Sequence, residues 1–180
     1  MNKTTKTFAL LFIAGLVLAG CGQKQDSTAT TEATTTTVAP TTATPTTVYS
    51  LEDAKKAVFE ATSSSGTDTM TLYYKDDVLL KQEKVSTFII SKLSGDNPLE
   101  MLEKSAGKTK EKLKVLIGKG IEYNTDYKDG VFTITDSCDY TKVDIQKFKE
   151  IYPQIQFRDD NTLSYSKYRD SLLDTNYVEK

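Results

Sequence analysis

A threonine-rich stretch near the N-terminus limits how much of this chain can fold. Between Thr28 and Thr47, twelve of the twenty residues are threonine. Apolar residues do not recur there at helical or strand spacing, so the stretch cannot bury enough surface to offset the entropy of ordering. This composition is typical of an extended tether, or of a spacer with no special reach. We therefore expect a lipidated cysteine and tether in residues 21–50 and one folded domain in residues 51–180.

Residues 1–20 have the pattern of a secretory signal peptide. Two lysines precede the apolar run Phe8–Leu18, which at about 1.5 Å per residue is too short for a bilayer core of about 30 Å. Leu18–Cys21 reads Leu-Ala-Gly-Cys, similar to the lipobox of bacterial lipoproteins, in which cleavage precedes the cysteine and a diacylglycerol joins its sulfur. Cys21 is the expected lipidation site; the alternative is a plain signal peptide with a chance cysteine. Acyl chains such as palmitate would anchor Cys21 to the extracytoplasmic side of the cell membrane.

Composition excludes several kinds of chemistry. The chain has no histidine, so no His general base, His-containing triad or His metal ligand is available. It has two cysteines, and lipid on Cys21 leaves Cys138 as the only thiol, which we interpret as a small buried apolar residue. The net charge is −2, whereas a nucleic-acid-binding protein typically carries a strongly positive charge. We expect neither a nucleic-acid partner nor a cofactor.

Local patterns in residues 51–180 predict helices and two hairpins. Helical spacing of apolar residues and end signals predict helices at Leu51–Ala61, from Pro98 to Gly118 or Gly120, from Asp144 to Pro153, and from Ser164 onward. Strands are expected at Met70–Tyr74, Val78–Ile90, Ile121–Lys128 and Val131–Tyr140, with turns at Lys75–Asp77 and Asp129-Gly130. This order predicts an α+β fold, an antiparallel sheet of two hairpins with helices packed on one face.

Three segments resemble the YehR-like family of small bacterial lipoproteins: Thr71–Asp77, Lys119–Asp129 and Asp139–Asp144. They follow that family's order of hairpin strand, helix, strand and hairpin arm over roughly residues 69–180. The resemblance implies an α+β lipoprotein domain and supplies no activity. The tether and the expected first helix are not typical of the family, and Asp136 and Cys138 stand where it usually has β-branched apolar residues.

The sequence contains no constellation that indicates catalysis or metal binding. The carboxylate pairs Asp76-Asp77 and Asp159-Asp160 fall where turns are expected and lack the ligand spacing of a calcium loop. Neither a serine nucleophile elbow nor a phosphate-binding glycine loop is present. We therefore assign no catalytic or metal-binding residue and do not expect an enzyme.

Five residues are candidate contacts with a ligand or partner. Tyr123 and Tyr127 share one face of a strand, and Tyr165 and Tyr168 share one face of a helix. Tyrosine combines apolar area with a polar tip, which suits a binding surface, although packing at the edge of the core is the alternative. Asp136 falls on the apolar face of its strand, where it could line a polar pocket. A strand bulge or a lysine partner would also explain it.

The expected function is that of a membrane-anchored extracytoplasmic lipoprotein of the cell surface. Its domain is expected to be a non-enzymatic binding module for an envelope, protein or small-molecule partner. The alternatives are a carboxylate-dependent hydrolase acting on cell-envelope material and a purely structural envelope protein. A pocket would favour a small ligand, a flat tyrosine-bearing patch a macromolecular partner, and two carboxylates converging across a cleft a hydrolase.

Overall fold

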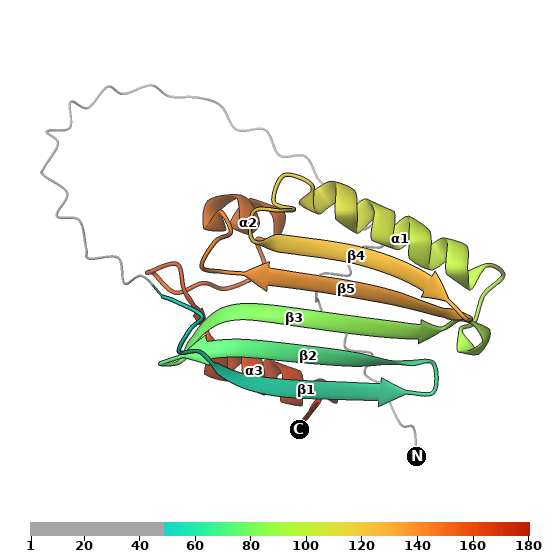
Figure 1. The fold of residues 1–180 in the computed structure, drawn as a ribbon, viewed down its shortest axis with the longest axis horizontal. Helices are drawn as coiled ribbons and strands as arrows, with labels where there is room; N and C mark the ends of the chain where they lie inside the picture. The colour runs from blue at the N-terminus through green and yellow to red at the C-terminus, as the bar shows by residue number, and fades with distance from the viewer. Residues whose placement is uncertain (1–48) are drawn as a thin grey trace, which may run out of the picture.

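The computed structural model describes residues 49–180, so the expected signal peptide, Cys21 and most of the expected tether lie outside the described residues. A sheet of seven antiparallel strands carries three α-helices (Figure 1). The strands are β1 (Lys55–Ser63), β2 (Gly66–Lys75), β3 (Val78–Ile89), β4 (Ile121–Lys128), β5 (Val131–Asp139), β6 (Leu163–Ser164) and β7 (Val178–Glu179). The helices are α1 (Pro98–Leu113), α2 (Ile145–Ile151) and α3 (Tyr165–Leu173), with a 3-10 turn, η1, at Ile90–Lys92. The expected α+β fold is confirmed.

The strand order is β4-β5-β3-β2-β1-β7, and β6 pairs with the beginning of β3. Both expected hairpins are present, β2–β3 and β4–β5, and they meet through the β3–β5 pair. Their two-residue turns have positive φ at both positions, 48° and 60° at Asp76 and Asp77, and 51° and 79° at Asp129 and Gly130. Such turns match the right-handed twist of the strands that they join. The β4–β5 register is continuous, whereas the β2–β3 register shifts once, between Tyr73 and Tyr74.

The expected helix at Leu51–Ala61 is wrong, because most of this segment lies in strand β1. All nine residues of β1 pair with β2 across a tight turn that ends at Gly66. Ala57 and Phe59 are buried at alternate positions, which is the period of a strand. The helical spacing in this segment was real but weak, and pairing with a neighbouring strand outweighed it.

The ends of the helices agree largely with their local signals. α2 begins after Asp144, whose carboxylate accepts bonds from the amides of Gln146 and Lys147. α3 begins after Ser164, whose hydroxyl accepts a bond from an amide. α1 begins at Pro98 as expected, but it ends at Leu113, earlier than the glycines at 118 and 120. The chain beyond Leu113 tightens into turns held by bonds between residues three apart.

All three helices pack on one face of the sheet. Residues directly opposite one another on neighbouring antiparallel strands point to the same side. One such row crosses five strands through Phe59, Met70, Lys84, Asp136 and Tyr123. Its outer members belong to the apolar clusters under the helices, so the expected one-sided arrangement is confirmed.

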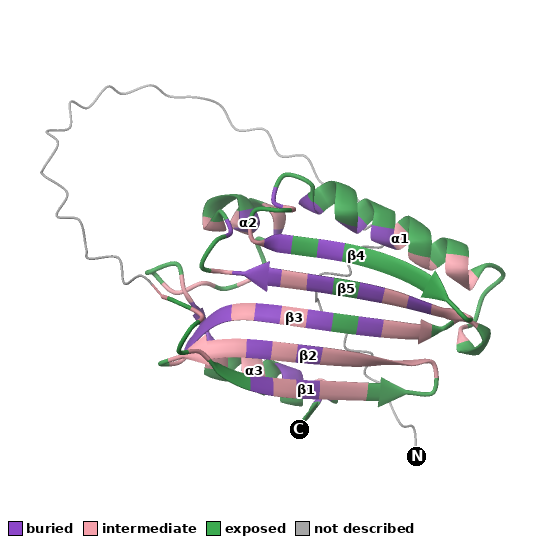
Figure 2. Cartoon of the chain, in the orientation of Figure 1, coloured by how far each residue is buried: buried purple, intermediate pink, exposed green. Residues whose placement is uncertain are grey.

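The covered face carries two apolar clusters separated by polar residues of the central strand. The buried apolar members of the cluster under α1 and α2 are Ala106, Leu113, Leu116, Ile121, Tyr123, Phe132, Ile134, Cys138, Val143, Phe148 and Tyr152. Those of the cluster under α3 are Ala57, Phe59, Met70, Leu72, Leu79, Leu163, Leu172 and Tyr177. Between them β3 contributes three buried polar residues, Gln82, Lys84 and Ser86 (Figure 2). Among residues 49–180, no helix combines the length and apolar character needed to cross a bilayer.

Candidate functional site

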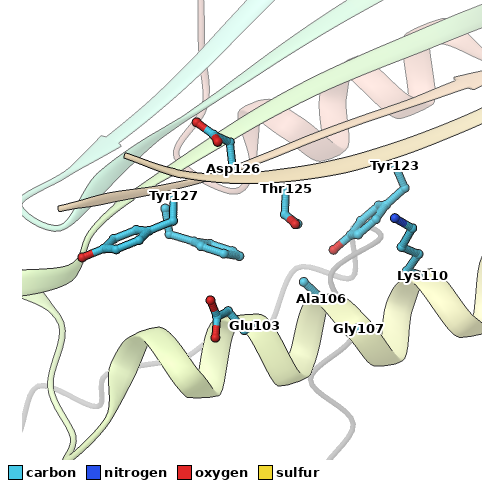
Figure 3. Close-up of a pocket in the computed structure, with 9 residues that line it drawn as sticks. Glu103, Ala106, Gly107, Lys110, Tyr123, Thr125, Asp126 and Tyr127 are labelled. Atoms are coloured by element: carbon cyan, nitrogen blue, oxygen red, sulfur yellow. The ribbon is translucent and has the colours of Figure 1, made fainter. Parts of the chain in front are cut away.

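A groove lies between helix α1 and strand β4, at the edge of the sheet (Figure 3). Its volume is about 310 Å³, which is at the lower end of the range for small-ligand sites. Residues from one stripe of α1 form one wall, and residues of β4 and β5 form the other. The lining residues are Glu103, Ala106, Gly107, Lys110, Tyr123, Thr125, Asp126, Tyr127 and Phe132.

The groove exists because α1 presents its smallest side chains to β4. Gly107 is in the interior of the sixteen-residue helix, where glycine costs about 1 kcal/mol relative to alanine. A Cβ at this position would meet nothing within 4 Å, so no neighbouring atom among the described residues requires a glycine. Gly107 is itself exposed, so the space that its missing side chain leaves beside Ala106 lies where the groove opens to solvent.

This reasoning predicts that Gly107→Ala stabilises the protein. The free energy of unfolding should rise by about 1 kcal/mol, because alanine loses less backbone entropy and meets no obstacle. Urea denaturation followed by circular dichroism measures the change. Gly118→Ala is the control, because its Cβ also meets nothing but its φ of 76° strains any other residue. Equal effects from the two substitutions would contradict the explanation.

Two of the five candidate residues, Tyr123 and Tyr127, line this groove. Tyr127 is 47% exposed, whereas Tyr123 is only 3% exposed and its ring belongs to the core. The Tyr123 hydroxyl is buried and has no hydrogen-bond partner among the described residues. Burial raises the pKa of this phenol, the neighbouring Thr109 hydroxyl opposes this shift, and the Asp136 carboxylate adds to it, so the phenol keeps its proton.

Asp136 lies directly opposite Tyr123 on β5 and is 5% exposed. Its Oδ2 has no hydrogen-bond partner among the described residues. Burial raises the pKa of the Asp136 carboxyl to about 7, and the Lys84 ammonium opposes this shift. The β3–β5 register is continuous through this residue, so a bulge does not explain its inward position. Its direct neighbour across the strands is Lys84, as the lysine alternative requires.

Lys84 is shared between two carboxylates in the middle of the covered face. Its ammonium lies 3.6 Å from Asp68 Oδ2, and Asp68 in turn accepts a bond of 3.4 Å from the Tyr177 hydroxyl. The Asp68 carboxylate also raises the pKa of Asp136. These groups therefore form a buried polar row between the two apolar clusters, next to the inner wall of the groove.

The other two candidate tyrosines lie elsewhere, on α3. Tyr165 stacks on Tyr74 with ring centroids 3.5 Å apart. Tyr168 donates a bond of 2.6 Å to Gln82 Oε1. Both pack against the cluster under α3, so the structure does not bring the four tyrosines together. Sequence reasoning also missed Glu103, Gly107 and Lys110, although the interior glycine of α1 was a usable signal.

The remaining polar candidates have structural positions. Asp77 accepts bonds from the Ser164 hydroxyl and the Ser166 amide, and it pairs with Arg158. Asp160 accepts bonds from the amide and hydroxyl of Thr162. Burial raises the pKa of the Cys138 thiol, so this residue is a poor nucleophile. Within residues 49–180, no three side chains of the His, Cys, Asp and Glu types are grouped so that they could hold a metal ion.

These features define a small α+β domain in which a helix leaves a groove beside an edge strand. The chain belongs to the DUF1307 family, described as a protein of unknown function, which it matches over residues 55–178. The resemblance to the YehR-like family is thereby confirmed.

Two solved structures are similar to this chain. The NMR structure of the E. coli YehR protein shares 19% identity, with 71% of this chain and 91% of that chain covered and a TM-score of 0.48. The NMR structure of a protein from Streptococcus pneumoniae TIGR4 shares 16% identity, with 87% and 100% covered and a TM-score of 0.46. No curated protein matches the chain significantly.

Proposed function

We propose that this protein is a membrane-anchored extracytoplasmic lipoprotein whose domain is a non-enzymatic binding module, with the groove between α1 and β4 as its binding site. The observation that carries the binding role is the interior glycine of α1. Gly107 lowers helix stability and leaves open space that no described side chain fills. A helix that served only to cover the core would gain stability from alanine at this position.

The described carboxylates favour binding over hydrolysis. A glycosidase of the expected kind needs two carboxylates across a cleft, one with a raised pKa. Asp136 has a raised pKa, but it lies buried between core strands, and its nearest charged neighbours are Lys84 and Asp68. Neither Asp136 nor Asp68 lines the groove, and of the two carboxylates that do, Glu103 and Asp126, Figure 3 shows Asp126 on the side of β4 away from α1, so the two do not converge. We therefore place the function in recognition.

A panel of ligands tests the binding role. Cell-wall fragments, metal ions, short peptides and small metabolites are added to the purified protein, and the thermal midpoint is measured. A ligand that binds only the folded state stabilises it by RT ln(1 + [L]/Kd). Gly107→Leu should fill the groove and remove the shift. Lys108→Leu, which introduces the same side chain at a position of α1 that does not line the groove, should retain it.

The outcomes of this panel are distinct. A shift that Gly107→Leu removes and Lys108→Leu retains supports binding in the groove. A shift that survives Gly107→Leu contradicts the groove as the site. No shift with any ligand contradicts the binding module and supports a structural role.

The lipid anchor has its own prediction. Cys21→Ala should abolish incorporation of a labelled fatty acid in the native host and release the protein from the membrane fraction, because the thioether forms on this sulfur. Cys138→Ala is the matched control and should remain labelled, since that thiol is buried in the core. If Cys21→Ala still incorporates the fatty acid, or stays in the membrane fraction without incorporating it, the lipid anchor at Cys21 is contradicted.

A further inference from the structure

The groove between α1 and β4 has opposite charges at its two ends. Glu103 and Lys110 both line it, and neither forms an ion pair or hydrogen bond with another residue in the part of the chain that the structure describes. Their neighbours four residues along α1, facing the groove, are Gly107 and Ala106, so the helix offers neither charge a partner there. Seven residues of helix place the two charges about 10 Å apart, too far to pair with each other.

Each end combines its charge with a tyrosine of β4. Figure 3 shows Lys110 on the same side of the groove as Tyr123, and Glu103 on the side of Tyr127. The Tyr123 hydroxyl itself is fully buried, so the group that a ligand can reach at this end is the exposed Lys110 ammonium. This ammonium suits a carboxylate. At the other end a carboxylate lies near an exposed aromatic ring, which suits an ammonium group.

The wall between these ends suits an extended peptide backbone. β4 is the last strand of the sheet, and beyond the bridge from Ile117 to Ile121 its outer edge has no partner strand among the described residues. Unpaired amides and carbonyls on such an edge can bond to an added extended chain. The Thr125 hydroxyl also points into the groove (Figure 3). The small residues Ala106 and Gly107, facing the aromatic ring of Phe132, leave room for an apolar side chain.

We infer that the groove binds a short extended peptide with free ends, its ammonium group at Glu103 and its carboxylate at Lys110. An extended chain advances about 3.4 Å per residue, so a span of about 10 Å corresponds to three residues. The inference rests on the proposed binding function and specifies the ligand of that same groove.

The tripeptide Ala-Leu-Ala, titrated into the purified protein by calorimetry, tests this inference. Acetylating its amino end, or amidating its carboxyl end, should weaken binding by up to about fivefold, which is the upper effect of an exposed ion pair. Glu103→Gln should bind the free and acetylated peptides equally, and Lys110→Gln should bind the free and amidated peptides equally. Glu100→Gln and Lys108→Gln change the same charges on exposed positions of α1 and should leave both discriminations intact.

The results separate this inference from the proposed function. The peptide and its direction are supported if Glu103→Gln no longer distinguishes the free peptide from the acetylated one. Lys110→Gln must likewise no longer distinguish the free peptide from the amidated one. Equal binding of free and blocked peptides by the unmodified protein overturns it. If no peptide binds, but another ligand gives a thermal shift that Gly107→Leu removes, the groove is a binding site and the peptide assignment is wrong. If neither peptides nor any other ligand bind, the proposed function fails as well.

Discussion

Asp136→Asn is expected to stabilise the protein at pH 8 by about 2 to 4 kcal/mol, with little effect near pH 4. Burial raises the pKa of this carboxyl from 3.8 to about 7. The folded state therefore holds a proton between these pH values that the unfolded chain has released. Stability falls as pH rises through this window, by about 1.4 kcal/mol for each unit of pKa difference. Asparagine cannot ionise, so the variant should not lose this stability.

Urea unfolding at several pH values between 4 and 9 measures the effect. Three other carboxyls, Asp77, Glu83 and Asp139, have lowered pKa values, because hydrogen bonds and nearby cations outweigh the effect of burial. The contributions of these three carboxyls to the free energy of unfolding are lost only as pH falls through their low pKa values. That pH range lies below the one in which Asp136 titrates. Asp126→Asn, on the opposite side of β4, is the control and should change stability by less than about 0.5 kcal/mol (Figure 3). The same pH dependence in Asp136→Asn and the unmodified protein would show that Asp136 does not titrate as inferred.

Gly66→Ala is expected to destabilise the protein by about 3 kcal/mol or more. A Cβ at Gly66 would lie 1.8 Å from the carbonyl oxygen of Thr87 and 2.9 Å from its carbonyl carbon. Thr87 belongs to β3, which pairs with β2 on one side and β5 on the other, so its backbone cannot retreat without breaking a pair. The Thr87 hydroxyl also bonds to the amide and carbonyl of Thr67, which holds the two strands together at this point. A side-chain atom forced against a backbone that cannot move is one of the few causes of a large loss of stability from a single substitution.

Chemical denaturation compares Gly66→Ala with Gly130→Ala. A Cβ at Gly130 would meet nothing within 4 Å, but its φ of 79° is unfavourable for other residues, so a loss of about 1 kcal/mol is expected. The contrast separates a steric clash from backbone strain. Similar losses in both variants would contradict the clash at Gly66. If Gly66→Ala does not accumulate in folded form while Gly130→Ala does, the clash at Gly66 costs more than the whole stability of the protein, and the prediction is confirmed.

Features that depend on a few consecutive residues could be predicted. The turns at Asp76-Asp77 and Asp129-Gly130, and the caps at Asp144 and Ser164, rest on φ preferences and hydrogen bonds within the local chain. The position of Asp136 on the inward face also followed from strand alternation. Its neighbour Lys84 did not, because that neighbour depends on which strand lies beside β5.

The candidate site shows the same division. The sequence placed Tyr123 and Tyr127 on one face of a strand, since side chains alternate along a strand whatever its partners are. It did not place Gly107 opposite them, because the docking of α1 on β4 depends on packing between distant segments. It also paired Tyr165 with Tyr168 as a candidate surface, whereas the packing of α3 directs both toward the core.

The sequence by itself determined the two hairpins, the starts of three helices and the α+β class, because each follows from local geometry and the period of apolar residues. The tertiary structure decided that residues 55–63 form a strand, since nine pairs with β2 outweigh a weak helical spacing. It also decided that β3 lies beside β5, which brings Lys84 to Asp136. The groove is likewise tertiary, because it lies between α1 and β4, and no local pattern specifies how these two separate segments pack.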